Sequence, residues 1–123
     1  METVKIIEHR GVEIIYLDFS CCSTRKMFEI MEEAKKVIRK HQLHSALTLT
    51  NVEGSRYNLE AVAALKEFTS GNKPFVRAGA VIGLDGMKRV IYEGVMRFSG
   101  RKLPVFDDIE KAKDWLVEQK GCS

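Results

Sequence analysis

The stretch Ala46–Asn58 reads ALTLTNVEGSRYN, and it decides the fold class. Leucine alternates with threonine in its first part, so we predict a strand over Ala46–Val52. The polar segment 53–56 forms a loop after that strand. Asn58 is a favourable N-cap, because its side chain can accept a hydrogen bond from a backbone N–H in the first turn of a helix. A strand, a short loop and a helix in this order are the repeating unit of an α/β sheet.

Units of the same kind follow along the chain. We expect the helix that begins after Asn58 to end at Gly71, before Pro74, because glycine and proline mark many helix C-termini. The later elements are, in order, a strand over Phe75–Leu84, a helix capped by Asp85, a short strand at Val105–Phe106, and a helix opened by the capping pair Asp107 and Glu110 and ending near Gly121.

Two strands and a helix precede the deciding stretch. The runs Val4–Glu8 and Val12–Phe19 are rich in β-branched and aromatic residues, and the Gly-containing connection 9–11 between them suits an antiparallel hairpin. Apolar residues recur at three- and four-residue steps over Thr24–Lys40, which predicts an amphipathic helix. The predicted order is ββαβαβαβα. We therefore expect one α/β domain over 1–123, with a mixed, mostly parallel sheet, an N-terminal hairpin and four helices.

The composition is that of a globular domain and excludes several classes of protein. The 123 residues include 45% hydrophobic and 30% charged residues, with a net charge of +3. Charge-free apolar stretches such as 78–84 are far shorter than the roughly 20 apolar residues of a membrane span. The first residues do not lead into a signal-peptide core. The sequence lacks the dense basic stripe that is typical of nucleic-acid-binding proteins. We expect a cytoplasmic protein.

Residue types with catalytic or ligating chemistry lack the partners that this chemistry needs. The three cysteines, Cys21, Cys22 and Cys122, form neither a disulfide framework nor a Cys-x-x-Cys pair, and no spacing places a histidine base beside the adjacent two. We expect those two to be buried structural thiols. His41 and His44 lack further zinc ligands at a matching spacing. The sequence therefore predicts no catalytic residues, no metal and no cofactor.

Ligands of open α/β sheets gather at the carboxyl ends of the strands, where loops and helix N-termini converge. Here the loops 20–24, 51–58 and 83–88 meet that description. Positive charge also concentrates on and after the third helix. The predicted binding surface consists of Asn51, Glu53, Gly54, Ser55, Arg56, Lys88, Arg89 and Arg97. This surface suits a protein partner or an anionic ligand.

A second interpretation places a ligand inside the molecule. In a carrier of a small apolar or lipid-like compound, a pocket between helices and sheet would be lined by Met27, Met31, Phe68, Met87 and Phe98. The same side chains would simply form the core of a docking module. Basic residues on the third helix would meet the ligand's headgroup in the carrier.

Three segments give the chain a resemblance to a known family. Together with the element order, the runs LTLTNV at 47–52, LKEF through NKP at 65–74 and FSGR at 98–101 resemble the STAS domain superfamily, in its SpoIIAA-like branch, from about Val12 to Gln119. The resemblance implies a non-enzymatic regulatory module, typified by anti-anti-sigma factors that bind a kinase partner. It also implies an architecture similar to that of CRAL-TRIO lipid carriers.

The resemblance also implies a switch, because the anti-anti-sigma members of the family are phosphorylated at an Asp-Ser-Ser/Thr-Gly motif after the third strand, at the start of the second helix. The corresponding segment here, 51–56, reads NVEGSR and does not reproduce that motif. Ser55 is its only hydroxyl and is the candidate phosphorylation site. We expect a regulatory binding module that docks a protein partner through the loop 51–58, the second helix and the basic third helix. A carrier or sensor of an apolar or lipid-like ligand is the alternative, and a homodimer remains open.

Overall fold

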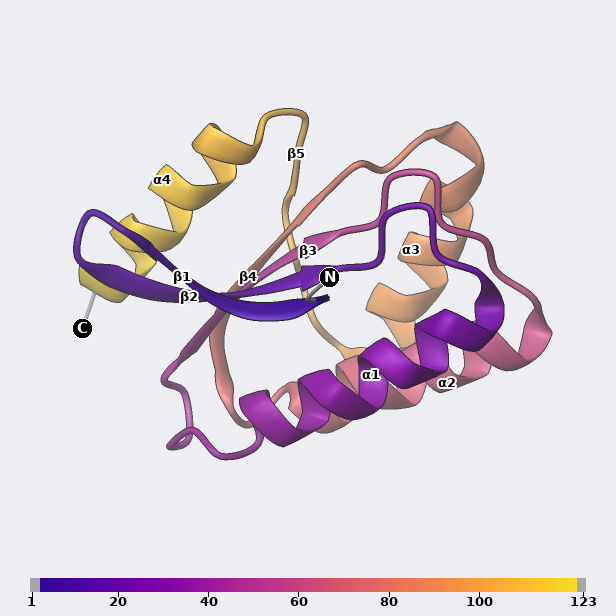
Figure 1. The fold of residues 1–123 in the computed structure, drawn as a ribbon, viewed down its shortest axis with the longest axis horizontal. Coiled ribbons are helices and arrows are strands. Elements are labelled where there is room, and N and C mark those ends of the chain that lie inside the picture. The colour runs from indigo at the N-terminus through magenta and orange to yellow at the C-terminus, as the bar shows by residue number, and fades with distance from the viewer. Residues whose placement is uncertain (1–2, 122–123) are drawn as a thin grey trace.

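Five strands form one sheet in the order β1-β2-β3-β4-β5 (Figure 1). The computed structural model describes residues 3–121, so Cys122 lies outside the described residues. The expected ββαβαβαβα order is confirmed. The strands are β1 (Val4–His9), β2 (Val12–Asp18), β3 (Ala46–Asn51), β4 (Val76–Ile82) and β5 (Val105–Phe106), and the helices are α1 (Thr24–Ile38), α2 (Leu59–Asn72), α3 (Gly86–Ser99) and α4 (Ile109–Gly121).

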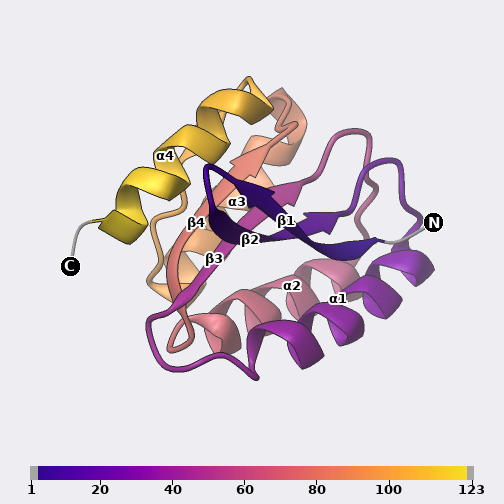
Figure 2. The same ribbon diagram turned by 60° about the vertical axis from the view of Figure 1, so that its left-hand side comes forward.

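The strand order assigns the helices to the two faces of the sheet. Strand β1 runs antiparallel to β2, whereas β2 to β5 are mutually parallel. The chain moves across the sheet in one direction, and right-handed crossovers therefore place α1, α2 and α3 on the same face. Helix α4 follows the last strand and covers the opposite face (Figure 2). Phe19, Met27 and Phe68 belong to the core under the three helices, and Leu49 and Leu116 belong to the core under α4.

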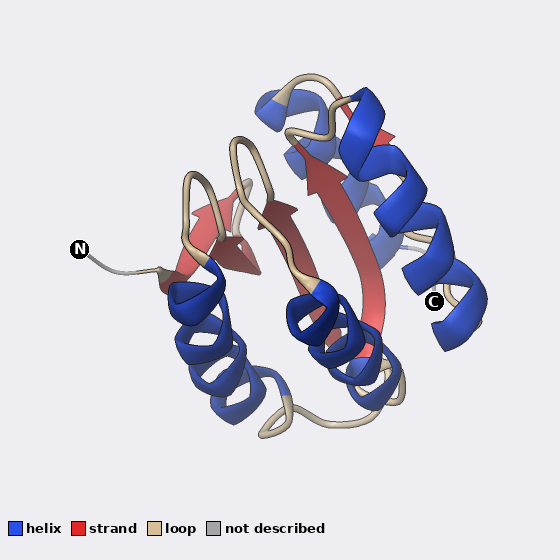
Figure 3. Ribbon diagram, turned by 90° about the vertical axis from the view of Figure 1, so that its right-hand side faces the viewer, coloured by secondary structure: helices blue, strands red, loops and turns tan. Residues whose placement is uncertain are grey.

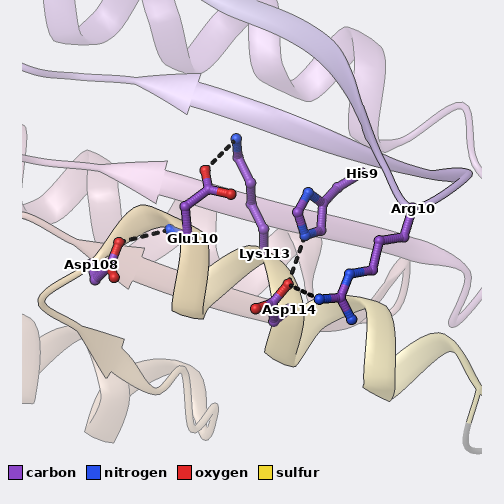
Figure 4. A network of polar contacts seen from close by, with 6 residues as sticks. All are labelled: His9, Arg10, Asp108, Glu110, Lys113 and Asp114. Carbon is purple, nitrogen blue, oxygen red and sulfur yellow. Dashed lines mark hydrogen bonds and ion pairs between the residues drawn. The ribbon is translucent and has the colours of Figure 1, made fainter.

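A two-residue turn closes the predicted hairpin. Arg10 and Gly11 have φ values of 54° and 77°, as a type I′ turn requires, and His9 pairs with Val12 across the turn. The turn also binds α4 (Figure 4). Nε2 of His9 lies 2.7 Å from Oδ1 of Asp114, and an Arg10 guanidinium nitrogen lies 3.3 Å from the same oxygen. This contact attaches the edge of the sheet to the C-terminal helix.

Two helix ends differ from the sequence prediction. Helix α2 continues through Gly71 to Asn72, because the Arg39 side chain lies against the glycine and its Nε donates to Oδ1 of Asn72 at 3.1 Å. The glycine therefore leaves space for a neighbouring side chain and does not end the helix. In α4 it is Asp108, not Asp107, whose carboxylate accepts the backbone N–H of Glu110, at 2.9 Å. Within residues 3–121 no helix has the length and apolar character needed to cross a bilayer.

The Asp114 contact predicts a pH-dependent contribution to stability. The hydrogen bond with His9, assisted by the charge of Arg10, lowers the pKa of the Asp114 carboxyl. A carboxyl group whose pKa is lower in the folded state than in the unfolded state stabilises the fold at pH values above its unfolded-state pKa. This stabilisation is lost as the pH falls through the folded-state pKa. Urea unfolding from pH 7 to pH 3 should therefore show Asp114→Asn to be less stable than the wild type above about pH 5, with a difference that narrows below it.

Asp107→Asn is the matched control, because Asp107 is an exposed carboxylate without an ion pair among residues 3–121. Its stability should follow that of the wild type over the same pH range. A difference between Asp114→Asn and the wild type that stays constant down to pH 3 would contradict the assigned role of Asp114.

Candidate functional site

A groove of about 1000 Å³ lies at the carboxyl ends of β3, β4 and β5. We call it the edge groove. Its apolar side chains come mainly from strand ends, and its polar side chains come from the loops and helix starts beside them. The lining residues are Asn51, Glu53, Gly54, Ile82, Gly83, Leu84, Asp85, Arg89, Val105, Phe106, Asp107 and Ile109. Asn51, Glu53, Gly54 and Arg89 were predicted from the sequence as binding residues, and the groove brings these four together.

The loops after β3 and β4 touch through their backbones. The Val52 N–H donates to the Ile82 carbonyl at 3.0 Å. Gly83 has φ +85°, and a Cβ at this position would lie 2.5 Å from the backbone nitrogen of Glu53. Asn51 accepts the Glu53 N–H at 3.0 Å and donates to the Tyr16 hydroxyl at 3.0 Å. The wall of the edge groove is therefore a fixed arrangement of two loops.

The loop after β2 packs on the outer side of these two, and the three loops share one edge of the sheet (Figure 3). Cys21 has φ 53°, and its N–H donates to the Glu53 carbonyl at 2.7 Å. Gly54 has φ +67°, and a Cβ there would lie 2.9 Å from Cys21 Sγ. Cys22 is buried, and its burial raises the pKa of its thiol. The expectation of two buried thiols is correct for Cys22 and wrong for Cys21, which is exposed because its side chain lies over Gly54 on the outer surface.

Ser55 is 6% exposed and lies beneath the same loop. Its hydroxyl lies 2.8 Å from the Val52 carbonyl and 2.8 Å from the Tyr57 hydroxyl. Burial raises the pKa of Tyr57, which keeps that phenol protonated at neutral pH. Phosphorylation of Ser55 stays a prediction, and it would require both hydrogen bonds to break.

The predicted basic residues do not form one surface. Arg56 and Arg89 are exposed, but the Lys88 side chain is only 11% exposed and its Nζ lies 2.6 Å from a carboxylate oxygen of Asp85, the N-cap of α3. This contact lowers the pKa of the Asp85 carboxyl. Arg97 is exposed two turns further along α3, roughly 12 Å from Arg89 along the helix axis. Only Arg89 of the three cations predicted on α3 remains available to a ligand at the edge groove.

A second space, which we call the inner cavity, lies between the sheet and the three helices α1, α2 and α3. Its volume is about 80 Å³, and Met27 and Phe68 are among its lining residues, as predicted. Met31 is buried in the core but does not line the cavity. Met87 and Phe98 are 87% and 52% exposed, so their assignment to a pocket is wrong.

The error at Met87 and Phe98 comes from the rotation of α3 about its axis. The helix turns Ile91, Val95 and Ser99 inward. This inward stripe can include polar residues because Lys88 buries its aliphatic stem, and because the Ser99 hydroxyl donates to the Val95 carbonyl at 2.8 Å. Hydrophobicity alone therefore places the buried stripe about one residue away from its position in the structure.

Sequence reasoning also missed Phe106 and Asp107, which line the edge groove. The short strand β5 was predicted, but its place beside β4 depends on long-range pairing. Val81 pairs with Val105, and Ile82 pairs with Phe106. The two apolar residues at 105–106 predict a strand, but nothing in the local sequence indicates that this strand borders a groove.

The fold has a solved counterpart. No family model matches the chain, and no curated protein matches it. The crystal structure of an uncharacterised DUF3478-family protein with a SpoIIAA-like fold, from Shewanella loihica PV-4, is similar with a TM-score of 0.72 at 12% identity, over 92% of this chain and 91% of that one. The SpoIIAA-like fold implied by the sequence resemblance is therefore confirmed.

The contact between the two groove loops predicts a cost for a methyl group at Gly83. Gly83→Ala should lower the free energy of unfolding by about 2 to 4 kcal/mol, because a left-handed φ and a collision with the Glu53 backbone act together. Gly11→Ala is the matched control. Gly11 has φ +77° and, beyond its two chain neighbours, no atom within 4 Å of the place that a Cβ would take, so its substitution should cost only about 1 kcal/mol. If urea unfolding shows the same loss of unfolding free energy in Gly83→Ala and Gly11→Ala, the contact between the two loops is not tight.

The buried position of Ser55 predicts a graded response to substitution. Ser55→Ala should cost about 1 kcal/mol, because it leaves the Val52 carbonyl and the Tyr57 hydroxyl without their shared partner. Ser55→Asp should lower the thermal midpoint further, because it buries a carboxylate in the same position. A Ser55→Asp midpoint at or above that of Ser55→Ala would show that the loop accommodates a negative charge.

Proposed function

We propose that this chain is a non-enzymatic regulatory module that docks a segment of a protein partner in the edge groove. The observation that carries the proposal is the groove itself. It is large enough for several side chains, it has Ile82, Val105 and Phe106 among its apolar lining, and it lies where three βα loops meet.

Exposed apolar side chains extend the surface beyond the groove. Leu59 and Met87 are 90% and 87% exposed in the first turns of α2 and α3, and Val90 is 71% exposed one turn later. Both helices begin at the edge of the sheet where the groove lies. Large apolar side chains in one area of a surface are typical of contact sites between proteins. They support the part of the proposal that includes the second and third helices.

The charges at the rim favour a particular kind of partner segment. Glu53 and Asp107 are exposed carboxylates without ion pairs among residues 3–121, and Arg89 stands on the α3 side. A segment with an apolar side chain for the groove and a neighbouring Lys or Arg for these carboxylates would complement the rim. The hydrogen bonds of the described residues join no cysteine, serine or threonine side chain to a histidine base, which favours binding over nucleophilic catalysis.

Site-specific crosslinking would identify the partner. A photoreactive amino acid at position 89 should capture a discrete protein in cells that produce this chain natively, because Arg89 lies on the groove. The same amino acid at Lys36, which is exposed on α1 away from the groove, should not capture that protein. Capture of the same protein with equal yield from both positions would contradict docking in the edge groove.

Binding of the captured partner should then depend on the apolar surface. Met87→Asp should weaken binding at least about tenfold by titration calorimetry, because it places a charge in the interface. Leu43→Asp is the matched control. Leu43 is 66% exposed in the loop before β3, which lies at the amino ends of the parallel strands, opposite the end that carries the groove. Leu43→Asp should change the dissociation constant for the partner by less than about twofold. Equal effects of the two substitutions would contradict the assigned surface.

A further inference from the structure

Arg101 brings a positive charge to the inner cavity without a neutralising partner. It follows α3, lines the cavity, and is partly buried. One of its terminal nitrogens donates to the Thr69 carbonyl at 3.3 Å, and no ion pair of the described residues includes it. Burial lowers the pKa of the guanidinium to about 10, so the group is still charged at neutral pH. A guanidinium offers five N–H donors, and one carbonyl satisfies only part of that capacity.

Thr48 provides a second polar group at the same place. It is 6% exposed and lines the cavity, and its hydroxyl can rotate to donate a hydrogen bond into that space. Gly79 on β4 lies between the two groups. A Cβ on Gly79 would lie 2.7 Å from Thr48 Oγ1 and 3.4 Å from a terminal nitrogen of Arg101, with Cδ2 of Leu103 beside them at 2.8 Å. The guanidinium and the hydroxyl therefore lie near one strand position that has no side chain, beside the apolar side chain of Leu103.

The remaining lining of the cavity is mostly apolar. Phe19 and Phe68 contribute aromatic rings, and Val81, Val95 and Met96 contribute aliphatic side chains. The cavity's volume of about 80 Å³ is far below the roughly 300 to 1,000 Å³ of pockets that hold drug-sized ligands. This space fits a compact molecule and is too small for the long acyl chain of a lipid.

We propose that the inner cavity binds a small monocarboxylate with a compact apolar chain. The carboxylate lies against the Arg101 guanidinium and accepts a hydrogen bond from the Thr48 hydroxyl. Its chain packs among the apolar side chains that line the rest of the cavity.

The chemistry of the cavity favours a carboxylate over other anions. Two oxygens in one plane match the two-pronged donor geometry of a guanidinium. Lys88 also lines the cavity but is paired with Asp85, so one negative charge neutralises the Arg101 guanidinium, whereas a phosphate dianion would leave excess charge among apolar side chains. Burial of a hydrocarbon chain against the apolar lining is energetically favourable, and an inorganic anion has no such chain.

Ligand titration followed by NMR tests the proposal with the intact chain. Isovalerate has the expected size and charge, and it should shift the amide signals of Thr48, Gly79 and Arg101 in a saturable manner. Isovaleramide has the same shape without the charge and should bind at least about tenfold more weakly. Saturable shifts of the same signals by isovaleramide at equal affinity, or by phosphate at equal affinity, would overturn the proposal, as would an absence of saturation with isovalerate in the millimolar range.

Two substitutions separate ligand binding from folding. Arg101→Gln should weaken isovalerate binding at least about tenfold while leaving the thermal midpoint unchanged or raised, because it removes a charge without an ionic partner. Arg97→Gln is the matched control, since Arg97 is exposed on α3 and does not line the cavity. It should leave affinity unchanged. Equal affinities of the two variants would overturn the proposal.

Thr48→Val provides a second test if Arg101→Gln fails to fold. It preserves the shape of the side chain and should weaken isovalerate binding about three- to tenfold through loss of the hydroxyl. An unchanged affinity of Thr48→Val for isovalerate would show that the Thr48 hydroxyl does not bind the ligand. The outcome is independent of partner docking, because neither Thr48 nor Arg101 lines the edge groove.

Discussion

Right-handed crossovers between strands that advance in one direction determine the arrangement of this molecule. Because β2 to β5 lie side by side in chain order, the three connecting helices must cover one face, and the loops that precede them must meet at one edge. Only α4 remains to cover the other face. Helices α3 and α4 flank the short strand β5 from opposite faces, and the edge groove lies at the end of that strand. The inner cavity lies on the other side of α3, against α2 and the sheet.

The sequence was sufficient to predict features that depend on local chemistry. Asn58 and Asp85 were expected to cap helices, and each accepts a backbone N–H of the first turn. The hairpin followed from two β-rich runs around Gly11. The carboxyl edge was expected to gather polar loops, because parallel strands end there together. These inferences need only the residue, its near neighbours and the rules that connect strands.

Features that depend on distant contacts could not be predicted from local chemistry. Gly71 was expected to end a helix, but the side chain of Arg39 from another helix lies against it. Lys88 is predicted to belong to the binding surface, although its stem is buried and its ammonium is paired with Asp85. Arg101 belongs to the positively charged region on and after the third helix, yet it lines the inner cavity. In each case the residue type is compatible with two environments, and tertiary packing selects one of them.

Helix α3 separates the two candidate sites and contributes different faces to each. Arg89 lies on the edge groove, whereas Ile91 and Val95 face the inner cavity. The ion pair between Lys88 and Asp85 stands where these two faces meet at the start of the helix. A side chain on one face can therefore be changed without removing a lining residue of the other site. Leu84 lines both sites, but Thr48 and Arg101 line only the inner cavity and Arg89 lines only the edge groove, so the failure of one proposal leaves the physical basis of the other intact.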